Sequence, residues 1–124
     1  MPIISGASAP TFSLPHATFT GLAAPSRGAE ETCVWRTRVH PGAPGAEHWF
    51  DREEVLVAVA GAAVATLDGV DHEVREGDAV VVPARTRFAL ANPHGEPFEA
   101  VVALPVGARA HMGEGEPFTP PPAE

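Results

Sequence analysis

The segment from residue 42 to residue 61 holds the side chains best suited to chemistry. It reads GAPGAEHWFDREEVLVAVAG, with an imidazole, His48, and a carboxylate, Glu54, on either side of Phe50. Residues two apart in a strand share a face, so His48 and Phe50 are expected to point the same way. In an apolar setting Glu54 could orient His48 and raise its basicity, which would make His48 a general base near neutral pH. The alternative is that the two residues are only structural and satisfy each other by a hydrogen bond.

Short Val-rich runs separated by Gly and Pro must position these two groups. The polar tetrad from Asp51 to Glu54 predicts a turn, and the run from Val55 to Ala60 fits a buried strand better than a helix. If Glu54 points inward, strand alternation places Leu56 and Ala58 on the same inner face. The segment therefore predicts an acid and a base at the mouth of an apolar interior.

Further strands are predicted along the rest of the chain. Alternation places Trp35 on an apolar face, and Asp68-Gly69 is the strongest hairpin signal in the sequence. The remaining predicted strands cover residues 31–40, 62–67, 70–75, 79–82, 88–92 and 98–104. About eight or nine short strands with tight turns and no convincing helix predict an all-β fold, closed as a barrel or a jelly roll.

The two ends of the chain differ from its centre. Residues 1–29 hold Pro2 and three further prolines, which forbid a long helix and predict an N-terminal arm with short edge strands at 11–14 and 17–20. Residues 30–105 are predicted to form the barrel. Residues 106–124 are rich in Pro and Gly, and we expect an extended tail that is poorly ordered beyond Gly113.

Composition and charge exclude several classes of partner. The net charge is −8 and no basic cluster stands out, so a nucleic-acid partner is not expected. The longest apolar runs are far shorter than a membrane span, and no signal peptide is visible. Cys33 is the only cysteine and cannot form an internal disulfide, which fits the cytoplasm. We expect Cys33 to be a small buried hydrophobic residue.

The spacing of these residues resembles the cupin superfamily. The first cupin motif, G-x5-H-x-H-x3/4-E-x6-G, is matched in spacing by Gly42, His48, Phe50, Glu54 and Gly61. The second, G-x5-P-x-G-x2-H-x3-N, is matched in spacing by Gly77, Pro83, Arg85, Phe88 and Asn92. Seven of these ten positions also keep the residue type of the motif. The resemblance implies a small, single-domain cupin with a jelly-roll barrel, and it implies a homodimer, for which the long N-terminal arm is a second argument.

Two departures from the motifs bear on function. In metal-binding cupins the ligands are the two His and the Glu of the first motif and the His of the second. Only His48 and Glu54 remain here, because Phe50 and Phe88 occupy the other two positions. Two protein ligands rarely hold a first-row metal, so no cofactor is expected. A divalent transition metal on His48 and Glu54 is the alternative, if a group such as His40 or Cys33 completes the site.

The inward-facing apolar residues outline a pocket for a small molecule. Its predicted walls are Trp35, Phe50, Leu56, Ala58, Phe88, Leu90, Phe98 and Val102. The first hypothesis is a metal-independent isomerase, cyclase or lyase for an apolar, aromatic or polyketide-like molecule, with His48 as the base. The second is a non-catalytic ligand-binding or sensor protein. The third is a metal-dependent oxygenase or isomerase with a rebuilt ligand set.

Overall fold

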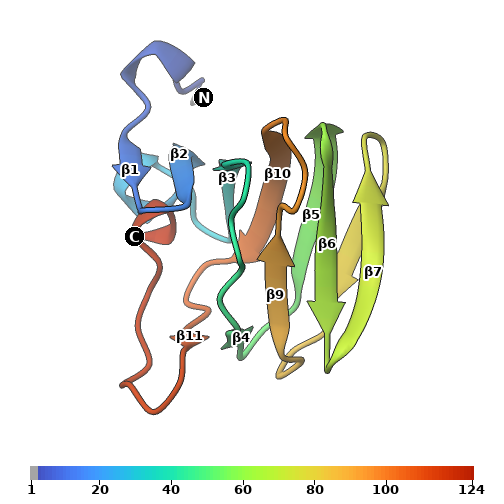
Figure 1. The fold of residues 1–124 in the computed structure, drawn as a ribbon. Coiled ribbons are helices and arrows are strands. Elements are labelled where there is room, and N and C mark those ends of the chain that lie inside the picture. Colours follow the sequence, from blue (N-terminus) through green and yellow to red (C-terminus); the bar gives the residue numbers. More distant parts are fainter. Residues whose placement is uncertain (1–2) are drawn as a thin grey trace.

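Two facing sheets form the body of the protein (Figure 1), whose computed structural model describes residues 3–124. The larger sheet is antiparallel, in the order β1 (Thr11–Ser13), β2 (Ala17–Ala23), β3 (Thr32–Val39), β10 (Phe98–Pro105), β5 (Glu54–Ala60) and β8 (Ala79–Val82). The facing sheet has the order β7 (Val70–Arg75), β6 (Ala62–Leu67) and β9 (Phe88–Ala91). A further pair, β11 (Ala110–His111) and β4 (Trp49–Phe50), continues this layer, because an isolated bridge joins His48 to Phe88 of β9.

This arrangement confirms the predicted all-β jelly roll. No α-helix occurs within residues 3–124, whose helical turns are the short 3-10 segments η1 (Gly6–Ser8), η2 (Pro25–Arg27) and η3 (Pro121–Ala123). None of the helices in this range is long and apolar enough to cross a membrane.

The alternation of apolar and polar residues decides which face of each strand is buried. In β3 the side chains of Cys33, Trp35, Thr37 and Val39 are buried, and Arg36 and Arg38 between them are exposed. In β10 every second residue from Phe98 onward is buried in the same way. These inner faces pack into one hydrophobic core between the sheets.

The start of β5 differs from the sequence-based expectation. Asp51 and Arg52 form a bend, but Glu54 is the first residue of β5 and is only 4% exposed. Its partner across the ladder is Val82 of β8. The prediction of a turn through Glu54 was therefore wrong in its last residue, because pairing with β8 extends the strand over a residue too polar to suggest one.

Both chain ends are tied to the larger sheet. β1 and β2 form where short edge strands were predicted, but of these two only β1 is an edge strand, because β2 also pairs with β3 in the same chain; Met1 and Pro2 lie outside the described residues. The chain then returns at its C-terminus to the side of β1 and β2 (Figure 1). There Pro122 and Ala123 are buried, and the thiol of Cys33 donates to the Ala123 carbonyl at 3.6 Å. The expectation of a poorly ordered tail was wrong for these residues, because they cover Cys33, which is fully buried as predicted.

Several residues of the two motifs hold the barrel together. Gly61 ends β5 with a φ of +76°, and a Cβ there would lie 2.2 Å from the carbonyl oxygen of Pro97. Asn92 is fully buried, and its side-chain amide donates to the carbonyls of Val39 and Glu96. Both residues join loops that are distant in the sequence, so their role in this chain is structural.

The close approach at Gly61 predicts a large loss of stability for Gly61→Ala. Gly69→Ala is a matched control, since Gly69 has a similar φ of +82° but nothing within 4 Å of its missing Cβ. The control should lose about 1 to 2 kcal/mol from the left-handed conformation alone. Gly61→Ala should lose about 3 kcal/mol or more, because the clash adds to that strain. Equal losses in chemical denaturation would show that the Pro97 contact is unimportant.

Candidate functional site

Aromatic rings surround His48 on two sides. Its ring meets Phe50 edge-on at a centroid distance of 5.6 Å and Phe88 at 5.5 Å. Two backbone hydrogen bonds hold this arrangement: the N–H of His48 donates to the carbonyl of Phe88, and the N–H of Phe88 donates to the carbonyl of His48. Phe50 and Phe88 are both buried, so the two rings at the metal-ligand positions of the motifs face inward and make the surroundings of His48 apolar.

The hydrogen bonding of His48 determines which ring nitrogen can act as a base. Nδ1 lies 2.9 Å from the carbonyl oxygen of Ala46, which can only accept, so Nδ1 carries the hydrogen. Nε2 is then the free acceptor of the neutral ring. Burial lowers the pKa of His48 below its ordinary value, and the hydrogen bond to Ala46 opposes this shift. His48 is therefore neutral at pH 7, with Nε2 able to take a proton.

Glu54 is a buried carboxyl group without a hydrogen-bond partner for one of its oxygens. Within residues 3–124, Oε1 is the only buried side-chain nitrogen or oxygen that lacks one. Burial raises the pKa of Glu54 from 4.5 to about 8. The carboxyl is therefore mostly protonated at pH 7 and can donate a proton or a hydrogen bond. An unpaired buried polar group costs about 1 to 3 kcal/mol, so its retention calls for an explanation.

The expected contact between His48 and Glu54 is not formed. Nδ1 of His48 is engaged by Ala46, and Oε1 of Glu54 has no partner, so neither residue satisfies the other as the sequence had suggested. Instead the two groups come from opposite layers. His48 is bridged to β9, and Glu54 begins β5 in the larger sheet. Figure 1 shows β4 and the starts of β5 and β9 at the same end of the barrel.

The residues at this end do not fit the metal centre that the cupin motifs imply. Within residues 3–124 no group of three or more His, Cys, Asp or Glu side chains is placed to hold a metal ion. Neither of the groups considered as replacements is free to help: Cys33 is covered by the C-terminal tail, and His40 shares a hydrogen bond with Thr18 on β2. The donors that remain at the motif positions are one imidazole and one carboxyl.

The predicted wall residues pack against one another. Those that belong to a single buried core are Trp35, Phe50, Leu56, Ala58, Phe88, Phe98 and Val102, with Leu90 packed against it. Two hollows lie elsewhere, one beside β7 and β8 and one near Thr32 and Val55, and His48 and Glu54 line neither. The side chains therefore face inward as predicted, neither of these two hollows is lined by them, and their role as substrate walls stays a prediction.

Two further features lie at this end of the barrel. The imidazole of His111, expected in a loose tail, stacks on the indole of Trp49 at 3.7 Å because β11 pairs with β4. Arg85, at a motif position usually held by glycine, keeps the left-handed conformation with a φ of +66°, and its N–H donates to the carbonyl of Phe50. The missing glycine was visible in the sequence, but no sequence signal pointed to the stack.

Comparison with solved structures shows many proteins of the same fold. The polyketide cyclase RemF from Streptomyces resistomycificus aligns with a TM-score of 0.77 and 17% identity, over 87% of this chain and 81% of that one. A cupin-superfamily sugar phosphate isomerase from Silicibacter pomeroyi aligns at 0.71 and 18% identity, over 92% and 83%. Salicylate 1,2-dioxygenase from Pseudoaminobacter salicylatoxidans aligns at 0.71 and 18% identity, over 86% of this chain and 31% of its own.

Sequence comparison identifies the family directly. No curated protein matches the chain. The sequence profile of the cupin domain matches residues 35–104, which is more than half of the chain and includes both motifs. The matched region runs from Trp35 in β3 to Leu104 in β10, and so covers both sheets apart from β1, β2 and the start of β3. The chain belongs to the cupin family.

Proposed function

We propose that this cupin binds a small apolar molecule and moves a proton on it without a metal, as an isomerase, cyclase or lyase, with His48 as the general base and Glu54 as the general acid. The observation that carries the proposal is the buried Glu54 carboxyl whose Oε1 has no partner. It lies on the layer opposite His48, whose Nε2 is the free acceptor. A molecule between the layers would meet a base on one side and an acid on the other.

The proposed step is the enolisation of a ketone. Nε2 of His48 takes a proton from the carbon next to the carbonyl, and the C–H electron pair becomes the C=C bond of the enol. The carbonyl electrons take the proton of Glu54, leaving His48 protonated and Glu54 ionised. Return of a proton to a different carbon completes an isomerisation, and attack of the enol carbon on a second carbonyl gives a cyclisation. His48 is taken as the base and Glu54 as the acid because the environments of an active site shift the pKa values of its acid and its base in opposite directions.

The apolar surroundings support this assignment. Phe50 and Phe88 each contact the imidazole edge-on, and their rings suit an aromatic or polyketide-like substrate. Cyclisation and isomerisation also fit the names of two proteins on the same fold, a polyketide cyclase and a sugar phosphate isomerase. The other predicted wall residues would contact the substrate only after the core between the sheets opens.

A non-catalytic ligand-binding protein is the second candidate. The observation that favours it is the packing of the predicted walls into one core, while the two hollows described above are lined by neither His48 nor Glu54. The two functions differ in what removal of His48 does. A binding protein would lose affinity or nothing, whereas a catalyst would lose turnover and keep its affinity.

Catalysis by His48 and Glu54 predicts a bell-shaped pH profile. The measurement is hydrogen–deuterium exchange at the acidic carbon of aryl ketones, beginning with 2-tetralone, followed by NMR. The rate should fall below the lowered pKa of His48, where the base is protonated, and above about pH 8, where the acid Glu54 is ionised. His48→Ala should lower the rate by about 10² to 10⁴ while the ligand Kd changes little. An unchanged rate in His48→Ala would leave only the binding function.

Burial of Glu54 also predicts that stability depends on pH. The pKa of Glu54 is about 8 in the folded state against 4.5 as its ordinary value, so the folded state holds an extra proton between these values. The free energy of unfolding should therefore fall by up to about 1.4 kcal/mol per pH unit as the pH rises from 5 to 8. Glu54→Gln mimics the neutral carboxyl, so its free energy of unfolding in urea titrations should not show this fall between pH 5 and 8. If the free energy of unfolding depends on pH equally in both proteins, the ionised Glu54 carboxylate must be in contact with water or a cation.

The two phenyl rings predict weak metal binding that can be restored by substitution. Isothermal titration with Ni²⁺ and Zn²⁺ should show no tight one-to-one site in the wild-type protein, because two ligands are too few. The double variant Phe50→His and Phe88→His recreates the four-ligand motif and should bind at least about 100-fold more tightly. Tight wild-type binding that is lost in His48→Ala would instead support a metal-dependent enzyme.

A further inference from the structure

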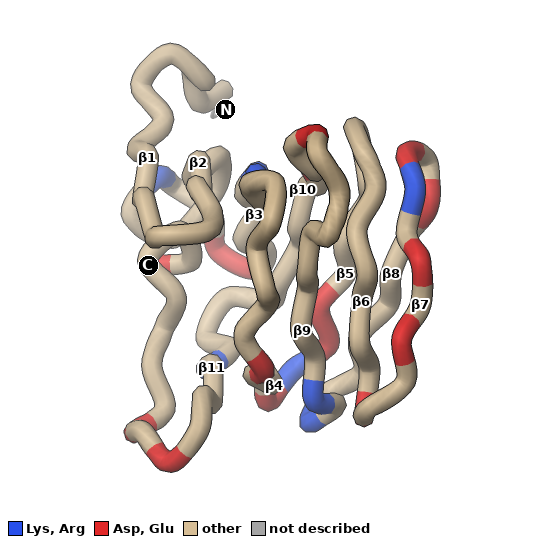
Figure 2. Tube along the Cα trace, in the orientation of Figure 1, with Lys and Arg blue, Asp and Glu red and all other residues tan. Residues whose placement is uncertain are grey.

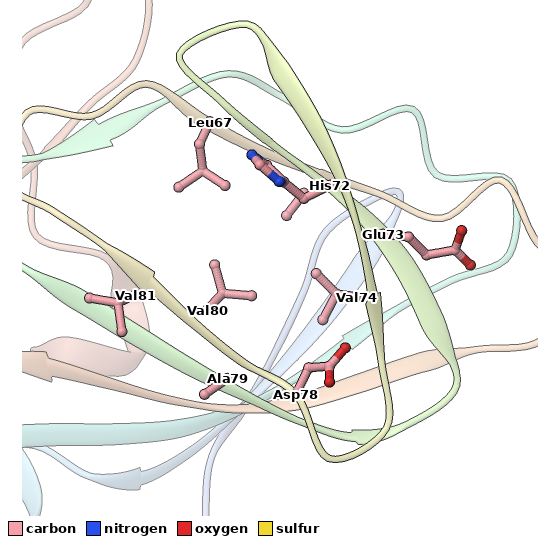
Figure 3. Close-up of a pocket in the computed structure, with 9 residues that line it drawn as sticks. Leu67, His72, Glu73, Val74, Asp78, Ala79, Val80 and Val81 are labelled. Atoms are coloured by element: carbon pink, nitrogen blue, oxygen red, sulfur yellow. The ribbon is translucent and has the colours of Figure 1, made fainter.

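The β7–β8 hollow is the larger of the two hollows described above, with a volume of about 440 Å³. It lies where β7, at one end of the smaller sheet, and β8, at one end of the larger sheet, each lack a second neighbouring strand. Figure 3 shows Leu67, Val74 and Val80 pointing into it from three different strands. Its volume falls within the usual range for small-molecule sites, and its floor is apolar.

The floor of this hollow is continuous with the inner face that carries His48. Antiparallel partners share a face, and His48 is bridged to Phe88, which in turn pairs with Leu67 of β6. His48 and Leu67 are thus two strand spacings apart, or roughly 10 Å. On the facing sheet Val80 pairs with Leu56, two residues from Glu54 along β5. The hollow therefore lies on the same inner faces as the proposed acid and base, with the buried side chains of Phe88 and Leu56 between them.

Charge around the hollow restricts what it can accept. The polar side chains that line it are His72, Glu73 and Asp78, and none of them is a fixed cation. Figure 2 shows acidic residues along β7 and its following turn, with Arg75 as the one basic residue there. Arg75 is paired with Glu73 at 2.9 Å, and its backbone N–H donates to Asp78. An anionic ligand would meet a net negative charge at this edge, because the acidic residues outnumber Arg75.

His72 supplies one of the hydrogen-bonding groups that line the hollow. It pairs with Ala65 of β6, so its side chain shares the inner face of the smaller sheet although it is exposed at the edge. Figure 3 places its ring beside Leu67, with Asp78 at the opposite end of the hollow and Glu73 directed away. A ligand with an apolar body could rest on Val74 and Val80 and direct a hydroxyl or an amine to His72 or Asp78.

From this geometry we infer that the β7–β8 hollow is the binding site for an apolar ring compound that is neutral or cationic, and that carboxylates are rejected. The inference rests on the proposed function only in taking this compound to be the one that reaches His48. No covalent step occurs in the hollow. Its side chains select the molecule by shape and charge, and the reacting groups lie deeper in the barrel.

Three probes of the same bicyclic shape test the inference: 2-naphthylmethylamine as the cation, 2-naphthol as the neutral form and 2-naphthoate as the anion. Titrations at pH 7, followed by NMR of the ¹⁵N-labelled full chain, give both Kd and location. We expect the amine and the naphthol to bind, with shifts concentrated around Leu67, His72 and Val80. We expect naphthoate to bind at least tenfold more weakly, and Asp78→Asn to reduce the advantage of the amine over the naphthol. Equal affinity for the three probes, or no binding by any, would overturn the inference.

Matched variants locate the site. Val80→Phe fills the hollow from its floor and should weaken 2-naphthol binding at least tenfold. Val57→Phe, on the outer face of the neighbouring strand β5, should leave it unchanged. If the melting curve shows that Val80→Phe does not fold, His72→Trp is used in its place, because it fills the hollow from the exposed rim. Equal Kd values in the filling variant and in Val57→Phe would overturn the inference.

His48→Ala separates this inference from the proposed function. Binding of 2-naphthol should survive His48→Ala, since the hollow does not include His48. Binding that is lost in His48→Ala but kept in Val80→Phe would place the ligand at the imidazole, which refutes the hollow and leaves the proposed function standing. Binding lost only in Val80→Phe, together with unchanged proton exchange in His48→Ala, would support the hollow and refute the catalytic role.

Discussion

The edge-on contact of two phenyl rings with the imidazole of His48 is the interaction on which the proposed chemistry of this barrel depends. Phe50 and Phe88 lie at the positions where a metal-binding cupin would carry histidines, and both rings are buried. Burial makes charge costly on both groups, so it lowers the pKa of the imidazole and raises the pKa of the Glu54 carboxyl. In the proposed function, the phenyl rings that replace metal ligands flank a neutral base, and a neutral acid lies on the facing sheet.

The motif residues that remain unchanged serve the architecture instead. Gly61 lets the β5–β6 turn pass close to Pro97, and Asn92 ties its own loop to β3 with hydrogen bonds from a fully buried amide. These contacts do not depend on what occupies the barrel. The cupin scaffold can therefore keep its spacing while the side chains at the centre change from cation ligands to aromatic rings.

The hydrophobic core and the β7–β8 hollow both lie between the two sheets. Apolar side chains from both sheets form the core, and the hollow lies where β7 and β8 reach the ends of their sheets. The core buries the Glu54 carboxyl, and the hollow leaves the edge of the two sheets open to a ligand. The unpaired Oε1 of Glu54 is the feature that this packing alone does not explain.

Sequence alone determined the fold, the strand pattern and the residues at the motif positions. Alternation in residues 32–39 and 98–105, the Asp68-Gly69 hairpin and the spacing of both motifs are local signals, and all reappear in the structure. Only the tertiary structure decided where His48 and Glu54 lie relative to each other. They lie on different layers, each in its own environment, and the hydrogen bond expected from their closeness in sequence is absent. It also decided the Trp49–His111 stack and the anchored tail, because contacts between distant segments leave no periodic trace in the sequence.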